Sequence, residues 1–577
     1  MKKAFVGMGV AIIGIVAGWT VWNFSLESPV AAARLVPAET LLLAEWPDLP
    51  GSALRWRHTA LAGIVREPEV QAFLGKPLAR LGQNAGWARA IGSLARLQPR
   101  SAFLAVATIT ENMPHAVFGI NYAGKRQEAE ALIAEGRAQV QAASPDGKLL
   151  REPYGKLQIE SYSDNGITIA VCVTHHSIFV ANDRELLKSV LDHASGQMLV
   201  ALNSSRAYRK SVKQLPRHPD FRLFVQPNPY SDKLLAGLVQ PVASGPGKIE
   251  AMALGLRFEG ANLRERLFIL QNTATPHPRL SYKTLGLTTP RTLFYGAMAP
   301  LLSEGSVQDP GVPPSGHPMR VLFSALSATP PATFSEFKSA FGPEHALLLD
   351  WPQTQSQPNL FLALEVRNPA QARKFVETAF RAWTRADAAG VSFWINNGNL
   401  PIHPAVALTE RHFLAGLSPE SLAPFASSAA HLPTQEGTLA QSPAYLKAMS
   451  AVGKPSIGMA YLDARPFFER FYGWLRPVII FWGSLKMGEI SDFSNLPLPE
   501  TIGRHLTPIS LSATQSGPGI LLESTGPITF LEVSAGLGVV GGAMILPRLQ
   551  VVPPPKKLPG TPPLQPSPLS APASPEP

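Results

Sequence analysis

The chain has 577 residues, of which 45% are hydrophobic and 16% charged, and its formal net charge is +10. This length has room for about two to four domains, and the apolar content suffices for a large core. The Lys and Arg residues are scattered, which argues against the clustered basic face of a nucleic-acid binder. The single cysteine, Cys172, excludes a disulfide framework and a cysteine-rich zinc site within one chain.

The N-terminus predicts a membrane anchor. Lys2 and Lys3 precede an uncharged apolar run over residues 4–24, about the 20 residues that a membrane-crossing helix needs. Positive charge before the run predicts that this end stays in the cytoplasm. The alternative is a cleaved signal peptide, because residues 30–33 offer small residues of the A-x-A type. The run exceeds the usual signal-peptide core of roughly 7–15 residues, so we favour an uncleaved transmembrane anchor in residues 1–34. Both versions export the body.

The body contains a weak internal repeat, with a first copy over residues 35–275 and a second over residues 285–530. The opening "LVPAETLLLAEWPDL" from Leu35 resembles "LTTPRTLFYGAMAPL" from Leu287. Further paired segments follow in the same order along both copies. No single match is convincing, but their shared order is typical of a duplication.

Each copy alternates strand pairs with helices. In the first copy "AFLAVATIT", "LQIESYS" and "ITIAVCVT" read as adjacent strands. Runs of adjacent strands predict the α+β class: two tandem copies of an antiparallel sheet with helices on one face. Cys172 falls inside the third strand, so we expect a small buried hydrophobe rather than a nucleophile.

A strand-to-helix step occurs once in each copy, at residues 177–195 and at residues 411–430. In the first, Asp183 is placed to cap a helix. In the second, Ser418 takes the cap position and Pro419 the first helical position. The apolar residues expected to face inward are Leu186, Leu187, Val190 and Leu191 in the first copy and Leu422 and Phe425 in the second. A cap that recurs while its neighbours change predicts a repeated piece of architecture rather than a catalytic corner.

The sequence contains no phosphate-binding loop, zinc-protease motif, nucleophile elbow or calcium loop. His175 and His176 are adjacent, so on a strand they would point to opposite faces and could not chelate one ion together. A metal site that pairs His175 with Asp183 is an alternative that we do not favour. We therefore predict no catalytic, cofactor-binding or metal-ligating residues, and no cofactor.

The segment "FYGWLRPVIIFWGSLKMG", residues 471–488, is strongly apolar and aromatic and has no clear match in the first copy. It is consistent with a buried helix, an interface or a membrane-surface patch. Of these, we favour packing in the core.

The C-terminal region offers a second candidate anchor. Residues 533–546 are uncharged but short for a membrane span, and extending them upstream brings in Glu532, at a cost of about 2.5–3.5 kcal/mol near a helix centre. We treat residues 531–549 as a candidate second transmembrane helix. The glycine pattern from Gly536 fits a dinucleotide loop, but no second strand follows it. Residues 550–577 are Pro-rich and are expected to be disordered.

These features together resemble an uncharacterised family of bacterial envelope proteins. The similar parts are the N-terminal anchor, the "LVPAETLLLAEWPDL" opening, "REPEVQAFL" at residues 66–74, "FVANDRELL" at residues 179–187 and "LNSSRAYRK" at residues 202–210. The family is catalogued as domain of unknown function 3352, and the resemblance covers most of residues 35–530. It implies a bacterial inner-membrane protein whose body faces the periplasm or the cell exterior, and it carries over no functional residues.

Three classes of function remain open. We favour a non-enzymatic, membrane-anchored envelope protein whose duplicated body binds a partner or serves as a scaffold. One alternative is a binder of lipid or another hydrophobic ligand, and another is an envelope hydrolase with a non-local active site. The expected partners are membrane lipid through the N-terminal helix and an envelope protein or hydrophobic ligand, with no nucleic acid.

Overall fold

The computed structural model describes residues 31–532, apart from 84–91, 111–112, 165, 198–199, 228–248, 273–277, 300–333, 353–357, 389–390, 398–402, 431–436, 488–490 and 531. The apolar runs at residues 4–24 and 533–546 and the Pro-rich tail therefore lie outside the described residues. Within the described part of the chain, no helix is both long enough and apolar enough to cross a bilayer. Met1–Phe530 form one compact unit, and Leu531–Pro577 form a second, of which only Glu532 is described.

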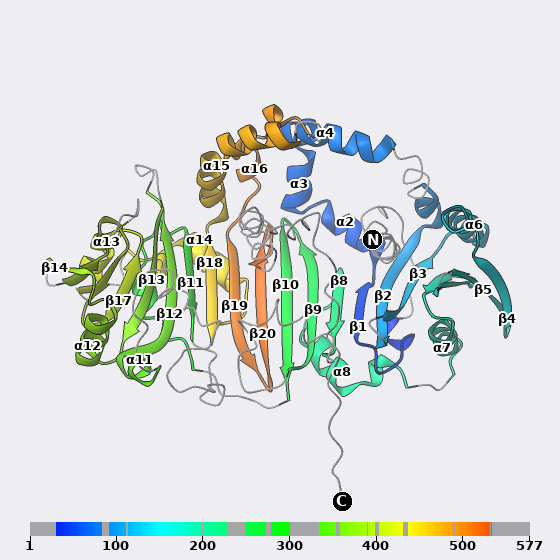
Figure 1. Cartoon of the computed structure of the whole chain (residues 1–577), viewed down its shortest axis with the longest axis horizontal. Coiled ribbons are helices and arrows are strands. Elements are labelled where there is room, and N and C mark those ends of the chain that lie inside the picture. Colours follow the sequence, from blue (N-terminus) through cyan, green and yellow to red (C-terminus); the bar gives the residue numbers. More distant parts are fainter. Residues whose placement is uncertain are drawn as a thin grey trace, which may run out of the picture. The chain divides into compact units, whose positions relative to one another are not determined.

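The first unit is built on one continuous antiparallel sheet of 20 described strands (Figure 1). The first half of the sheet runs, in spatial order, through β4 (Lys148–Tyr154), β5 (Leu157–Asp164), β6 (Ile167–Val173), β7 (Ser177–Ala181), β3 (Met113–Tyr122), β2 (Pro99–Thr110), β1 (Leu42–Trp46), β8 (Phe221–Val225), β9 (Ile249–Glu259) and β10 (Asn262–Gln271). The second half continues through β20 (Gly519–Gly526), β19 (Ile509–Ser516), β18 (Gly458–Leu462), β11 (Phe294–Met298), β12 (Phe341–Asp350), β13 (Asn359–Val366), β17 (His412–Gly416), β16 (Ala405–Leu408), β15 (Val391–Ile395) and β14 (Thr384–Ala388).

The two halves share one connectivity. Read outward from the junction between β10 and β20, each strand of the first half has a counterpart ten strands later in the chain, from β10 and β20 out to β4 and β14. The matching hairpins β9–β10 and β19–β20 turn through Gly260 and Gly517, at φ of 60° and 56°. A glycine at the first position of a two-residue hairpin turn accommodates this positive φ without strain.

The helices cover both faces of the sheet, which corrects the expectation that they lie on one face. In the first half, α7 (Arg184–Ala194) packs on the face that carries Phe179, whereas α6 (Arg126–Ala143) packs on the face that carries Ile178. Adjacent residues of a strand point to opposite faces, so these helices sandwich the sheet. In the second half α13 (Pro419–Ala430) and α12 (Pro369–Ala379) repeat this arrangement around Leu414 and Phe413. Further helices of the body include α8 (Arg206–Val212), α11 (Phe334–Ala340) and α14 (Pro443–Ser450).

The predicted caps are confirmed. The Asp183 carboxylate accepts hydrogen bonds from the backbone N–H groups of Glu185 at 2.7 Å and Leu186 at 3.2 Å, at the start of α7. The Ser418 hydroxyl accepts one from the N–H of Ser421 at 3.2 Å, at the start of α13. The expected inward stripes are buried: Leu186, Leu187, Val190, Leu191, Leu422 and Phe425.

The single cysteine behaves as predicted, whereas the adjacent histidines do not lie on a strand. Cys172 is 1% exposed, and burial raises the pKa of its thiol to about 11, so the reactive thiolate is disfavoured. Strand β6 ends at Val173, and His175 and His176 sit exposed in the turn that follows, with ring centroids 4.4 Å apart. No group of three metal-ligating side chains occurs among the described residues.

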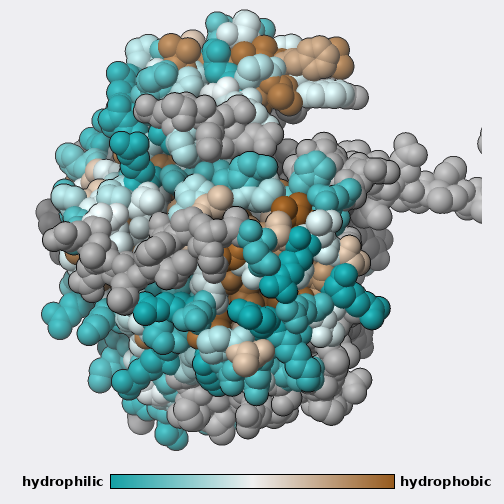
Figure 2. Space-filling model, turned by 90° about the vertical axis from the view of Figure 1, so that its left-hand side faces the viewer, coloured by the Kyte–Doolittle hydropathy of each residue, from teal (hydrophilic) through white to brown (hydrophobic). Residues whose placement is uncertain are grey.

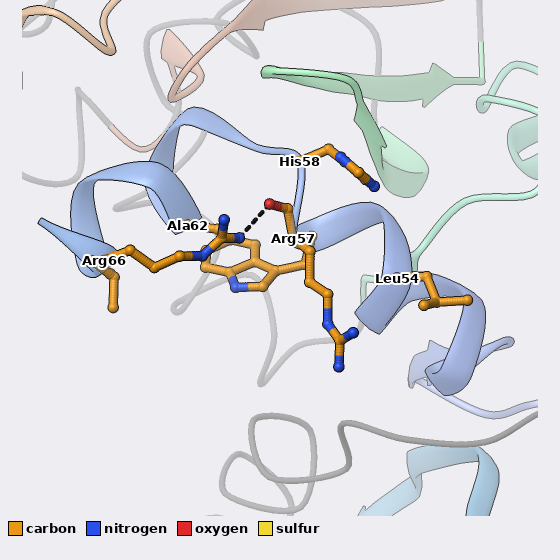
Figure 3. A pocket seen from close by; sticks show the side chains of 7 residues that line it. Leu54, Arg57, His58, Ala62 and Arg66 are labelled. Carbon is orange, nitrogen blue, oxygen red and sulfur yellow. Dashed lines mark hydrogen bonds between the residues drawn. The ribbon is translucent and has the colours of Figure 1, made fainter.

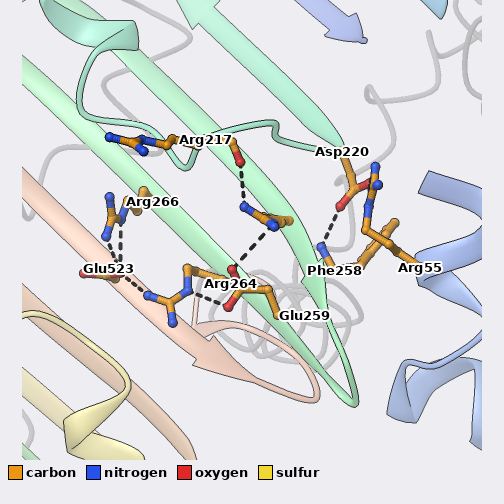
Figure 4. A network of polar contacts seen from close by, with 9 residues as sticks. Arg55, Arg217, Asp220, Phe258, Glu259, Arg264, Arg266 and Glu523 are labelled. Carbon is orange, nitrogen blue, oxygen red and sulfur yellow. Dashed lines mark hydrogen bonds and ion pairs between the residues drawn. The ribbon is translucent and has the colours of Figure 1, made fainter. Parts of the chain in front are cut away.

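A polar network spans the junction between the halves (Figure 4). The Glu523 carboxylate on β20 accepts hydrogen bonds from Arg264 at 2.8 Å and from Arg266 at 2.9 and 3.0 Å, both on β10. Arg264 also donates to Glu259 at the end of β9, at 2.8 Å. Because Glu523 is only 4% exposed, these guanidinium groups offset the cost of burying its charge.

Candidate functional site: an exposed apolar helix face

The apolar segment at residues 471–488 forms most of α15 (Ala464–Met487), a helix of 24 residues that follows β18. Near its start Pro466 lies in the first turn, where a missing N–H is tolerated. The Arg465 guanidinium donates to Glu469, one turn later, at 2.9 Å. Up to Leu485, the charged residues of α15 all lie between Arg465 and Arg476. Residues 477–485 are therefore uncharged.

One side of α15 packs against the chain that follows it, which includes the short helices η6 (Phe493–Asn495) and α16 (Pro499–Gly503). The Tyr472 hydroxyl donates to the carbonyl of Pro497 at 2.9 Å, and Arg476 donates to the carbonyl of Leu496 at 3.0 Å. At Gly483 the two segments approach so closely that a Cβ atom would lie 2.3 Å from the Phe493 ring. The absence of a side chain at Gly483 therefore allows this packing.

Helices of the first copy support the same assembly. After α2 (Leu49–Trp56), α3 (Ala60–Arg66) leads into α4 (Pro68–Gln83). In α4, Phe73 stacks edge-on against Phe493 at 5.6 Å, and its carbonyl accepts a hydrogen bond from Ser491 at 2.8 Å. Figure 1 shows α4 and α15 meeting beyond the ends of the strands. We call α3, α4, α15, η6 and α16 the helical arm.

An ion-pair cluster ties the base of the arm together. Glu67, between α3 and α4, contacts both Arg504 and His505, which follow α16. Its hydrogen bonds to His505 and then to Arg504 hold the pKa of Glu67 below the usual value. The arm is thus assembled from parts of both copies, by contacts between residues more than 400 positions apart.

The opposite side of α15 is uncovered, which corrects the favoured prediction that this segment packs in the core. Five large apolar side chains are between 51% and 66% exposed: Trp474, Val478, Phe481, Trp482 and Leu485. Their spacing places them along one side of the helix. Figure 2 shows hydrophobic side chains gathered at the top of the molecule, where the arm lies. We call these five residues the α15 apolar face.

A shallow, cationic hollow of about 580 Å³ lies where α2 leads into the arm, on α2, α3 and the turn between them (Figure 3). Arg57, His58 and Arg66 line it together with Leu54 and other apolar side chains, and Arg66 donates to the carbonyl of Arg57. Arginine side chains can hold phosphate or carboxylate groups, so this hollow adds positive charge next to the arm.

Asp183 makes a second contact that no local sequence pattern indicates. Its carboxylate lies 2.6 Å from Nδ1 of His115, whose Nε2 lies 2.5 Å from the Thr110 hydroxyl. Partial burial opposes ionisation, but the two backbone N–H groups and His115 together hold the pKa of Asp183 below its usual value. A hydroxyl, an imidazole and a carboxylate in line resemble a nucleophilic triad.

A structural role explains this trio better than a catalytic one. Thr110 is exposed at the end of the β2–β3 hairpin, and none of the three side chains lines the hollow on α2–α3. Asp183 is already engaged as the cap of α7. The trio therefore fastens the hairpin to the start of α7. The histidine that contacts Asp183 is therefore His115. His175, which the sequence offered as a partner for Asp183, lies in the β6–β7 turn instead.

The comparisons with known proteins do not identify the chain. No family model and no curated protein matches it. Among solved structures, crystal form III of TP0453 is 11% identical, with a TM-score of 0.25, over 44% of this chain and 82% of that one. Crystal form I of the same protein gives 11% identity and a TM-score of 0.25, over 43% and 81%. Scores this low support no conclusion about fold or function.

Proposed function

We propose that this chain is a non-enzymatic, membrane-anchored envelope protein whose body docks on a lipid surface through the α15 apolar face. The observation that carries the proposal is the exposure of Trp474, Val478, Phe481, Trp482 and Leu485 on one uncharged side of a long helix. A soluble body rarely exposes so many large apolar side chains together unless that surface meets another apolar one.

The composition of this face favours a lipid surface as the occupant. Trp474 and Trp482 are the residue type that settles at the boundary between headgroups and acyl chains. Fully burying one aliphatic or phenyl side chain gains roughly 1.5–3 kcal/mol, and five half-exposed side chains can act together. Arg470, one turn before Trp474 on the same side of the helix, would suit anionic headgroups.

The predicted anchor provides a second reason to choose lipid. An amphipathic helix alone binds membranes reversibly, and stable attachment takes a second signal. The apolar run at residues 4–24 would tether the body to a bilayer and raise the effective concentration of the α15 apolar face there. Placement at a bacterial inner membrane, with the body facing the periplasm, is part of this proposal and rests on that run and on the family resemblance.

A site-specific probe tests the docking. Cys172 is 1% exposed, so a cysteine introduced by Val478→Cys can be labelled selectively with an environment-sensitive fluorophore. The matched control is Leu446→Cys on α14, another half-exposed apolar residue of a helix in the second copy. Both full-length variants are reconstituted in vesicles of phosphatidylethanolamine and phosphatidylglycerol, and quenching is measured with spin-labelled lipids and with aqueous iodide.

We expect the probe at position 478 to be quenched by the spin-labelled lipids and shielded from iodide, and the probe at position 446 to show the reverse. Equal access of iodide to both positions would refute the docking. Protection of position 478 from both quenchers would also contradict it, and would assign the face to a protein partner or a second copy of the chain.

A further inference from the structure

Three matching positions differ in character between the two copies. In the first copy, Ser101, Asn121 and Ser177 lie on neighbouring strands β2, β3 and β7. They form a closed, neutral chain: Ser177 donates to Asn121 at 2.6 Å, and Asn121 donates to Ser101 at 2.8 Å.

The second copy carries three ionisable residues at the corresponding positions. These are Glu344 on β12, Glu365 on β13 and His412 on β17. His412 lies directly opposite Glu365, and Glu344 precedes His345, which pairs with Leu364, the residue before Glu365. The turn before His412 is shared with the first copy, because Thr409 closes it as Thr174 does. Within that turn, Glu410 and Arg411 replace His175 and His176. The same scaffold is therefore charged in only one copy.

Of these residues, Glu365 and His412 line a cavity of about 530 Å³, a size typical of sites for small ligands. It lies between the short helices η3 (Thr284–Leu287) and η5 (Leu439–Gln441) and the turn between β16 and β17. Its ionisable lining residues include Lys283, Glu365, Glu410, Arg411 and His412. Cations and carboxylates thus face one space.

Glu344 is part of the framework. It is 0% exposed and accepts hydrogen bonds from the N–H groups of Ser281 at 2.7 Å, Tyr282 at 2.6 Å and Thr284 at 2.9 Å. These bonds hold Tyr282 at a φ of 59°, in the left-handed region that is unusual for a tyrosine. The wall that brings Lys283 to Glu365 is therefore rigidly placed.

His412 is the group that the fold leaves unsatisfied. It is 6% exposed and lines the cavity, and neither Nδ1 nor Nε2 has a hydrogen-bond partner among the described residues. Burial lowers the pKa of His412 to about 4, so the ring is neutral at neutral pH. A neutral imidazole offers one N–H donor and one acceptor. An unpaired buried polar group of this kind costs about 1–3 kcal/mol unless a ligand satisfies it.

We propose that this cavity binds a short peptide with free termini. Arg411 would hold the terminal carboxylate and Glu410 the terminal ammonium group. The His412 ring, whose nitrogens are buried, would turn toward the cavity on binding and pair with a peptide N–H or carbonyl. Glu410 and Arg411 are exposed, line the cavity and form no ion pair within the described part of the chain, so both charges are available to a ligand. A peptide matches both the two opposite charges and the neutral donor and acceptor of His412.

Calorimetric titration of the full-length protein in mild detergent tests this proposal. The probe is L-alanyl-L-alanine, and the control ligand is the same dipeptide acetylated at one end and amidated at the other. The decisive variant, Glu365→Asn with His412→Ser, installs the residues that the first copy holds at these positions. The matched control is His176→Ala, at the first-copy counterpart of Arg411.

We expect the wild type and His176→Ala to bind the free dipeptide but not the capped one, and the double variant to lose binding. Arg411→Gln should weaken binding by about tenfold or more, and because Arg411 is exposed this variant decides the outcome if the double variant does not fold. No binding to the wild type at millimolar dipeptide, equal binding of the capped dipeptide, or unchanged affinity in Arg411→Gln would each overturn the proposal.

Discussion

At the residue scale, Asp183 has two roles, and each role involves a different group of neighbouring atoms. As a cap it satisfies two backbone N–H groups of α7, and as a carboxylate it holds His115. We expect Asp183→Ala to lower the free energy of unfolding by about 0.5–2 kcal/mol, the usual cost of losing an N-cap. Asp183→Ser, which copies Ser418 of the second copy, should recover most of that loss. Urea unfolding at neutral pH measures both.

The pH dependence identifies the charged part of this contribution. Because the folded pKa of Asp183 is lowered, its stabilisation is present above the unfolded pKa and is lost as the pH falls through the folded one. The wild type should therefore lose more stability than Asp183→Ser between neutral and strongly acidic pH. Identical acid profiles for the two proteins would contradict a charged cap.

The cap was predictable from sequence, whereas its partner was not. A short polar residue just before an apolar stripe is a local signal, which is why Asp183 and Ser418 could both be assigned. His115 lies 68 residues before Asp183, and only the pairing of β3 with β7 brings them together. For the same reason nothing in the sequence indicates that Glu365 and His412 face one cavity.

At the element scale, the arm depends on one close approach. We expect Gly483→Ala to push α15 away from η6, because the added Cβ would meet the Phe493 ring. Hydrogen exchange should then lose protection in α15 while the strands stay protected. The matched control is Gly473→Ala on the same helix, where the nearest atom to the added Cβ is 3.9 Å away. Because alanine has the better helix propensity, we expect the exchange protection of α15 in this control to equal or exceed that of the wild type. Similar loss in both variants would argue against a specific contact at Gly483.

The sequence indicated a strongly apolar segment at residues 471–488 but not which way it faces. The side of α15 that is covered depends on Phe73, in the first copy, and on Phe493, in the chain that follows α15. The helices on the second face of the sheet show the same limit. In α6, the buried Ala129 gives little hydrophobic signal, so nothing local distinguishes its face from that of α7.

At the scale of the whole molecule, the order of similar segments in the sequence predicts two copies, but it does not predict that both halves join in one sheet. Strands β10 and β20 occupy matching places in the two halves, and they pair antiparallel with Arg266 opposite Glu523. These two residues are themselves counterparts, each six places after the glycine of its hairpin, Gly260 or Gly517. Two identical copies would place like charges opposite each other there. The two halves therefore differ at their junction in a way that makes it complementary in charge.

This complementarity predicts how the unit unfolds. Because the sheet continues through the β10–β20 pairing, the wild type should lose both halves in one transition. Glu523→Arg would leave Arg264 and Arg266 facing a third cation in a buried position, at a cost of about 3 kcal/mol or more. We expect two separate denaturant transitions in that variant, and partial return to one when Arg266→Glu is added. Glu250→Arg, on an exposed position of β9, should leave the single transition unchanged. If Glu523→Arg unfolded like that control, the ion pairs would not be what couples the two halves.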